Sequence, residues 1–160
     1  MALLNIITEK DPTLRKKSRP VTEITDRILT LLDDMAETMR DAEGVGLAAV
    51  QVGVLRRVVV IETEPGELIE LINPVIVKKS GKQRTYEGCL SLPGKCGITE
   101  RPMDVTVEAL DRRGNRIIIN GSGLLAKAFC HEIDHLDGIL YSDVAEHMLT
   151  DEEIRKMNEE

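Results

Sequence analysis

The stretch "SGLLAKAFCHEIDHLDG", residues 122–138, decides the fold. Its pattern predicts one helix that is capped by Ser122 and ends at Gly138. The apolar side chains of this helix lie on more than one face, so we expect the helix to be buried at the centre of the protein. These apolar residues are Leu124, Leu125, Ala128, Phe129 and Ile133.

His131 and His135 stand four residues apart in this stretch, so their side chains lie on the same face of the helix. Two imidazoles at this spacing can bind one metal ion, and Glu132 beside them can act as a general acid/base. The alternative is a pair of helix histidines that only form hydrogen bonds. Because the chain has three histidines and two of them stand at ligand spacing, the pattern favours a metal site.

A catalytic metal centre needs a third protein ligand and one open position. One class of metalloproteases has a further histidine six residues after the second, but Tyr141 stands there. We therefore expect the third ligand upstream, at Cys89 in "YEGCLSLPG", residues 86–94. A thiolate with two imidazoles suits Fe²⁺, Zn²⁺, Co²⁺ or Ni²⁺. The alternative is that Cys89 is a small buried apolar residue.

A third stretch, "EGVGLAAVQVG" at residues 43–53, has two glycines through which the backbone can approach a ligand, followed by Gln51. Taken alone, it is more typical of a glycine-rich turn from helix to strand with an exposed glutamine.

The remaining chain predicts a small α+β domain. An apolar stripe predicts a helix over residues 25–44, with Thr25 as its cap. β-Branched runs predict strands over residues 56–62 and 67–77, and residues 104–120 predict a hairpin. Thr150 and Glu153 form the capping box of a short C-terminal helix. We expect one domain over residues 1–160, with small antiparallel or mixed sheets around the central metal-binding helix.

Composition narrows the functional classes. The chain has 160 residues, 42% of them hydrophobic, and a formal net charge of −7, which argues against binding to DNA. Neither a signal peptide nor an apolar run long enough to span a membrane is evident. Its three cysteines indicate free thiols or metal ligands in a reducing cytoplasm.

Taken together, "GVGLAAVQ", "EGCLS" and "HEIDH" resemble, in this order and at these separations, the three signature motifs of peptide deformylases. The likeness also includes "LRKKSRPV", "LINPVI" and "LDGILY". It implies a hydrolase (EC 3.5.1.88) that removes the formyl group from N-formylmethionine on nascent polypeptides. That activity belongs to the bacterial cytoplasm or an organellar matrix.

The resemblance also implies nine functional residues in four groups. They are the metal ligands Cys89, His131 and His135; the general acid/base Glu132; the oxyanion-stabilising side chain of Gln51 and backbone N–H of Leu90; and the substrate-holding backbone of Val45, Gly46 and Gly88. The family characteristically uses Fe²⁺ and tolerates Ni²⁺, Co²⁺ or Zn²⁺. By the usual affinity order Zn²⁺ binds more tightly than Fe²⁺, so an isolated sample can carry the wrong metal.

Three positions depart from the family pattern. Val50 stands where proline is usual, Cys130 where glutamine is common, and Cys96 where arginine is frequent. The absent arginine removes one charge-based contact with the outer residues of a substrate. We expect Cys130 to pack in the core, because adjacent helix positions do not share a face.

Further expectations concern the surroundings of the metal. Arg101 and Glu87 are predicted to pair and brace the Cys89 loop; the alternative is two solvated charges. The methionine side chain of the substrate is expected near Leu124 and Ala128, with Val45 opposite.

Two other functions fit parts of the pattern. Four ligands, Cys89, Cys96, His131 and His135, would instead make a structural zinc site in an interaction module. A peptidase could use the same "HEIDH" motif. The acidic tail "LTDEEIRKMNEE" differs from the basic helix by which some deformylases dock on the ribosome, so we expect no stable ribosome docking through it.

Overall fold

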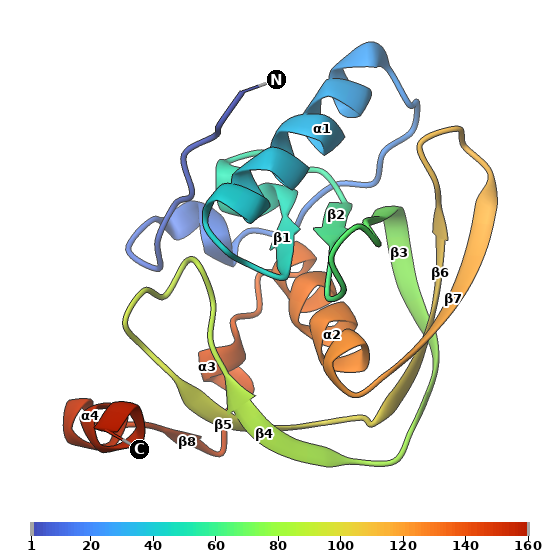
Figure 1. The fold of residues 1–160 in the computed structure, drawn as a ribbon. Coiled ribbons are helices and arrows are strands. Elements are labelled where there is room, and N and C mark those ends of the chain that lie inside the picture. Colours follow the sequence, from blue (N-terminus) through green and yellow to red (C-terminus); the bar gives the residue numbers. More distant parts are fainter. Residues whose placement is uncertain (1, 160) are drawn as a thin grey trace.

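The computed structural model describes residues 2–159, and it has two antiparallel sheets arranged around one helix (Figure 1). The helices are α1 Asp26–Asp41, α2 Leu124–Leu136, α3 Tyr141–Val144 and α4 Asp151–Glu159. The strands are β1 Gly46–Ala48, β2 Val58–Ile61, β3 Ile69–Ser80, β4 Gln83–Glu87, β5 Gly97–Arg101, β6 Asp104–Leu110, β7 Arg116–Ser122 and β8 His147–Met148. Short 3-10 helices cover Pro12–Arg15 and Ala49–Val52.

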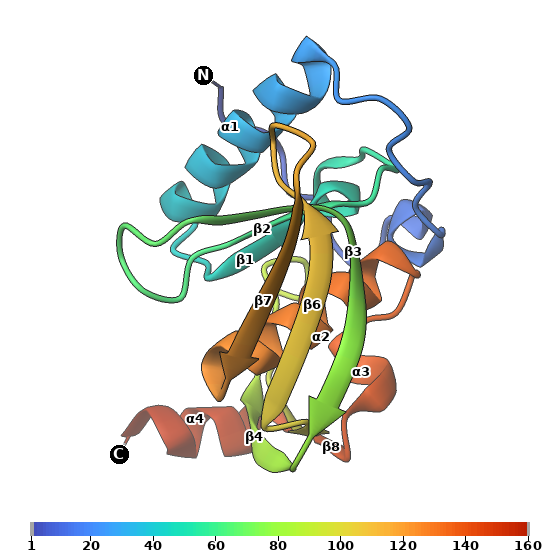
Figure 2. The ribbon, with the colours of Figure 1, turned by 90° about the vertical axis from the view of Figure 1, so that its right-hand side faces the viewer.

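The larger sheet has the order β1-β2-β3-β6-β7, and the smaller has the order β4-β5-β8. In the long strand β3, the register against β6 shifts twice, between Ile72 and Val75 and between Ile76 and Lys78. Such irregularities bend a strand, and Figure 2 shows β3, β6 and β7 curving side by side past α2. This arrangement confirms the predicted α+β class and the central helix.

Strand β2 is buried on both faces, which explains its uninterrupted apolar sequence "VVVI". Val58 and Val60 pack in the cluster that contains the apolar face of α1, whereas Val59 and Ile61 pack in the cluster that contains α2. The edge of the sheet that carries β1 and β2 therefore lies between two helices (Figure 1).

Helix α1 follows the predicted stripe. Ile28, Leu32, Met35 and Met39 are buried, and the Thr25 hydroxyl accepts a hydrogen bond from the Ile28 backbone N–H. The hairpin predicted over residues 104–120 is also confirmed as β6 and β7.

The start of α2 differs from its prediction. Ser122 is the last residue of β7, and its hydroxyl donates to Asp104, so it does not cap the helix. Gly123, with a φ of 61°, makes the sharp turn from strand to helix instead. At the other end the helix stops at Leu136, and Gly138 adopts a φ of 76° where a Cβ would lie 2.5 Å from the Arg15 carbonyl oxygen.

The strands of the smaller sheet were not among those predicted from the sequence. Its strand β5 pairs with β4 on one side and with the two-residue strand β8 on the other. After β8 the chain ends in α4, which has the predicted capping box between Thr150 and Glu153 and contains no buried residue. No helix within residues 2–159 is both long and apolar enough to cross a bilayer.

Candidate metal centre

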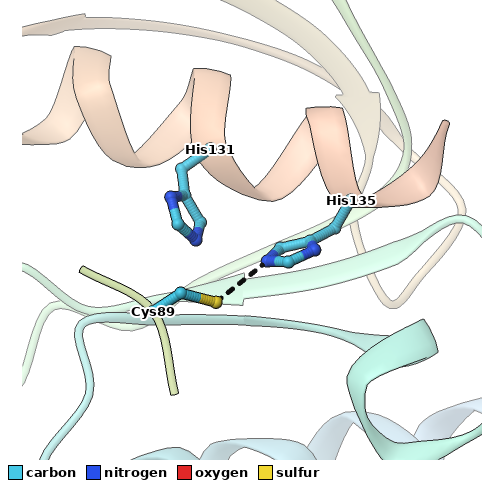
Figure 3. Close-up of side chains that lie close together, drawn as sticks. All are labelled: Cys89, His131 and His135. Atoms are coloured by element: carbon cyan, nitrogen blue, oxygen red, sulfur yellow. Dashed lines mark hydrogen bonds between the residues drawn. The ribbon is translucent and has the colours of Figure 1, made fainter. Parts of the chain in front are cut away.

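Three predicted ligands from two distant segments meet at one point. Cys89 follows β4, and His131 and His135 come from α2; one ligand atom of each lies within 4.8 Å of the other two. The Cys89 Sγ is 3.3 Å from the Nε2 of His135 (Figure 3). The two imidazole rings stand edge to face, with centroids 4.9 Å apart. This geometry is what a small cation bound by one thiolate and two imidazoles requires.

The Cys89 sulfur accepts two N–H groups from its own side of the site. The Ser91 backbone N–H donates to it at 3.4 Å, and the Gln51 Nε2 donates at 3.6 Å. The Gln51 amide also donates to the Ser91 hydroxyl at 3.1 Å, and its oxygen accepts from the Ala48 N–H at 2.9 Å. These hydrogen bonds hold the Cys89 sulfur where the three ligand atoms meet.

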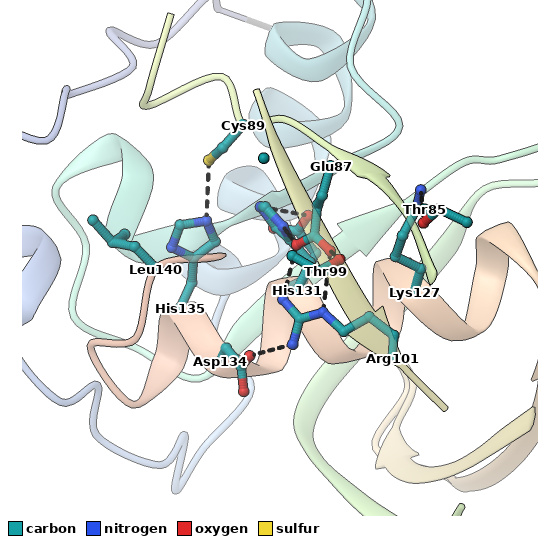
Figure 4. Close-up of polar contacts among 12 residues, drawn as sticks. Thr85, Glu87, Cys89, Thr99, Arg101, Lys127, His131, Asp134, His135 and Leu140 are labelled. Carbon is teal, nitrogen blue, oxygen red and sulfur yellow. Dashed lines mark hydrogen bonds and ion pairs between the residues drawn. The ribbon is translucent and has the colours of Figure 1, made fainter. Parts of the chain in front are cut away.

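The Nδ1 of His131 lies 2.5 Å from a carboxylate oxygen of Glu87, so the Nε2 is directed at the site (Figure 4). Glu87 in turn accepts two hydrogen bonds from Arg101, at 2.8 and 3.1 Å, and one from Thr99. Arg101 also donates to Asp134 of α2 at 2.8 Å. The predicted Glu87–Arg101 pair is therefore present, and it ties the Cys89 segment to the helix that bears the histidines.

Charge around the site favours a cation. Burial alone would raise the pKa of Glu87, but the hydrogen bonds from His131 and Arg101 outweigh burial and lower that pKa to about 2. Burial lowers the pKa of His135 to about 3, so this imidazole is neutral at pH 7. Burial also acts to lower the pKa of His131, but the surrounding carboxylates and thiolate raise it well above its usual value. The anionic groups thus stabilise positive charge where the three ligands meet.

Glu132 is buried beside the ligands with one carboxylate oxygen, Oε1, that has no hydrogen-bond partner within residues 2–159. Its Oε2 lies 4.0 Å from the Nε2 of His131. Burial raises the pKa of Glu132 to about 7, a value at which a carboxylate can both take and give a proton at neutral pH. A Cβ on Gly46 would lie 2.6 Å from Oε2, so only glycine leaves room for this carboxylate.

A cavity of about 390 Å³ opens onto these groups. Of the nine predicted site residues, His135 is completely buried behind the cavity and the other eight line it: Val45, Gly46, Gln51, Gly88, Cys89, Leu90, His131 and Glu132. Leu124 and Ala128 also line the cavity.

Several neighbours of the site were not assigned a role from the sequence. Ser91 was visible in "EGCLS", but nothing in that string shows that its hydroxyl accepts from Gln51. Asp134 and Thr99 complete the Glu87–Arg101 network only through the fold. Tyr141 stacks on His131, with ring centroids 5.9 Å apart, and its buried hydroxyl has no partner within the described chain.

The other two cysteines do not join the ligand group. Cys130 is buried in the core, as predicted. Cys96 is half-buried and is absent from the cluster of converging ligand atoms found in residues 2–159, so the four-ligand structural zinc site is not favoured. All three cysteines are free thiols.

A family model described as polypeptide deformylase matches residues 3–150. A peptide deformylase from Alkaliphilus metalliredigens is 59% identical over 143 residues, which cover 89% of this chain and 97% of that protein. One from Acetivibrio thermocellus is 55% identical over 159 residues, covering 99% and 93% of the two chains.

Solved structures give the same match for the fold. A peptide deformylase from Legionella pneumophila superimposes with a TM-score of 0.87 at 40% identity, covering 99% of this chain and 96% of that chain. One from Thermotoga maritima gives a TM-score of 0.88 at 34% identity, covering 91% and 99%.

Proposed function

The chain belongs to the polypeptide deformylase family of metal-dependent hydrolases that remove N-formyl groups, and from this premise we propose that it acts on formylmethionine at the N-terminus of nascent polypeptides (EC 3.5.1.88). The observation that carries the proposal is the convergence of Cys89, His131 and His135 beside a buried Glu132 at the floor of an open cavity. The alternative of a peptidase with the same helix motif is disfavoured by the family match over residues 3–150.

Cys89, His131 and His135 would hold one divalent ion. When bound, such an ion would lower the pKa of a coordinated water to about 7 and so would supply hydroxide at neutral pH. Glu132 would accept at its carboxylate the proton of the water that attacks the formyl carbon, and it would return a proton to the leaving amine as the C–N bond breaks. A pKa near 7 supports both transfers.

Gln51 and the backbone N–H of Leu90 are proposed to stabilise the oxyanion that forms on the formyl oxygen. The Gln51 Nε2 already lies 3.6 Å from the Cys89 sulfur, and Leu90 lines the same cavity. Removal of one such donor typically costs about 3 kcal/mol of transition-state stabilisation. Ser91 acts here as a positioning residue, because its hydroxyl orients the Gln51 amide.

The substrate backbone is proposed to lie between two unpaired strand edges. β1 is an edge of the larger sheet and β4 an edge of the smaller one. Gly46 in β1 and Gly88 directly after β4 both line the cavity, and Val45 lies beside Gly46. An extended peptide can add its own N–H and C=O groups to such edges, while its methionine side chain packs near Leu124 and Ala128.

We propose Fe²⁺ as the native ion, as the family resemblance implies, with Zn²⁺, Ni²⁺ or Co²⁺ in samples prepared in air. The Cys–His₂ donor set is compatible with all four ions. The proposed site of action is the bacterial cytoplasm, where formylated chains are made, since the similar proteins come from bacteria. The acidic residues of α4 make stable docking on ribosomal RNA unfavourable, and the net charge of −7 likewise disfavours DNA as a partner.

The test combines metal analysis of protein prepared without oxygen with formate release from a formylmethionyl peptide. We expect about one ion per chain in both the native protein and Glu132→Gln. The variant is expected to lose at least about 100-fold in kcat, because it cannot transfer the proton. Glu152→Gln, on the exposed surface of α4, is the matched control and should keep full activity.

Full activity in the metal-loaded Glu132→Gln protein would show that the assigned proton transfer is wrong. A non-formylated peptide, assayed in parallel, distinguishes the peptidase alternative, which predicts internal cleavage. Cys96→Ser addresses the structural zinc alternative: loss of the ion would support that alternative, and retained ion and activity would exclude it.

A further inference from the structure

Lys127 contributes a positive charge to the wall of the cavity. It lies on α2 four residues before His131, which is about 6 Å along the helix axis toward the exposed Leu124. Its Nζ donates to the Tyr86 carbonyl at 2.9 Å and to the Thr85 hydroxyl at 3.1 Å, so the side chain crosses from α2 to β4 (Figure 4).

In the part of the chain that the structure describes, only neutral groups bind the Lys127 ammonium. No ion pair joins it to any aspartate or glutamate within residues 2–159, and its two hydrogen bonds leave one N–H free. Of the residues that line the cavity it is the one lysine or arginine. Glu43, an exposed residue before β1 that also lines the cavity, carries the opposite charge but does not pair with Lys127.

If the substrate peptide lies as proposed above, Lys127 is placed to contact the third residue of the substrate. Along an extended peptide, side chains alternate between two sides, so the first and third residues point the same way. If the first points toward Leu124 and Ala128 of α2, the third also faces α2, about 7 Å further from the formyl group. Lys127 already donates to the carbonyl of Tyr86 in β4. A peptide that extends along β4 from Gly88 toward Tyr86 therefore meets the ammonium.

We propose that Lys127 is a specificity-determining residue that makes the site favour formylmethionyl chains with Asp or Glu as the third residue. The free N–H of the ammonium donates to that carboxylate without releasing β4. This inference rests on the proposed deformylase activity and adds a class of preferred substrate to it.

The test measures kcat/KM for three peptides, formyl-Met-Ala-Glu, formyl-Met-Ala-Gln and formyl-Met-Ala-Lys, each with a C-terminal amide. For a partly exposed charge pair we expect the native enzyme to favour Glu over Lys at the third position by about threefold. Lys127→Gln should bring the ratio close to one, and Lys127→Glu should reverse it. Lys17→Gln, which removes an exposed lysine outside the cavity, should leave the ratio unchanged.

The dependence of the rates on salt distinguishes an electrostatic effect of Lys127 from a structural one. Raising the ionic strength should reduce the Glu/Lys ratio of the native enzyme toward one and leave the rate on the Gln peptide nearly constant. A Lys127 that only holds β4 against α2 would give a different result, because its removal would lower all three rates by a common factor. An unchanged Glu/Lys ratio in Lys127→Gln would therefore overturn the inference.

The same experiment tests the deformylase activity and the role of Lys127 separately. Formate release from the Gln peptide tests the deformylase activity by itself, and the Glu/Lys ratio tests Lys127. Absence of formate from all three peptides with metal-loaded enzyme would overturn the proposed function and, with it, this inference.

Discussion

At the scale of single residues, Glu87 is the carboxylate that contacts both a candidate metal ligand and a buried arginine. Its carboxylate lies between His131 and Arg101 and is almost fully buried. Because both partners hold it in the ionised form, its pKa of about 2 is well below the usual value of 4.5. A carboxyl whose pKa is lowered by folding stabilises the protein above its unfolded pKa, and this stabilisation is lost as the pH falls toward its folded pKa.

We therefore expect the metal-free protein to lose stability as the pH falls from about 4.5 to about 2, partly through Glu87. The loss is on the order of 3 kcal/mol in the free energy of unfolding for this group. Glu87→Gln should be less stable than the native protein at pH 7, and the difference should shrink across this window. Urea unfolding at several pH values measures it, with Glu152→Gln, on the exposed surface of α4, as the control. A difference that stays constant with pH would contradict this assignment.

From the sequence alone one could predict three candidate ligands, which the structure brings together, but not the residues that hold them in place. The spacing of His131 and His135 follows from helix geometry, and Cys89 followed from the need for a third ligand. The contacts of Ser91, Asp134 and Thr99 depend on which segments the fold brings together, and no local pattern carries that information. The close approach of the Glu132 carboxylate to Gly46 likewise depends on the packing of β1 against α2.

At the scale of elements, that contact of β1 with α2 leads to a prediction. Gly46→Ala would place a methyl group 2.6 Å from the Glu132 oxygen, and the buried carboxylate would have to move. Because displacements of this size in a reacting group cost up to about 100-fold, we expect kcat to fall at least tenfold. Metal content should stay the same.

The control is Gly66→Ala, in an exposed turn with a φ of 83°. It should lower the melting temperature without changing kcat, whereas Gly46→Ala should lower kcat. Equal kcat values for Gly46→Ala and the native enzyme would show that the Glu132 carboxylate does not need its present position.

The C-terminal segment gives a second prediction at this scale. α4 has no buried residue, whereas Met148 of β8 pairs with Gly97 and packs against the core. Deletion from Asp151 onward should therefore leave melting temperature and formate release nearly unchanged. Deletion from Glu146 onward, which also removes β8, should lower both. Loss of activity in the shorter deletion would show that α4 has a role in the site.

Elements with strong periodicity could be predicted, and those without it could not. The stripe of α1 and the apolar run of β2 each match the structure within a few residues. β4 and β5, by contrast, have the sequences "QRTYE" and "GITER", in which polar residues predominate. They form a sheet because they pair with each other and because Glu87, Thr99 and Arg101 point inward to the network, which reverses the usual rule that charged residues face solvent.

At the scale of the whole molecule, a bound ion would link the segment that follows the smaller sheet to the helix that packs on the larger sheet. Cys89 is attached to the smaller sheet, and the histidines lie on the helix against the larger one. An ion that binds only the folded chain stabilises it by about 4 kcal/mol when its concentration is 1,000 times the dissociation constant. We expect a chelator to lower the melting temperature of the loaded protein by several degrees.

In Cys89→Ser, which lacks the sulfur ligand, the chelator should have little effect on the melting temperature. Calorimetry of both proteins, with and without chelator, measures this difference. If the native protein loses its ion and melts at the same temperature, the ion does not connect the two parts energetically.

The candidate ligands come from segments far apart along the chain, so the site is completed only when these segments come together during folding. Cys89 and His135 are 46 residues apart, and the hairpin of β6 and β7 is formed from the chain between them. A contact of such long range forms late, after the local hairpins and helices. A partly folded chain therefore has no complete binding site, so uptake of the ion during refolding should report the last stage of assembly.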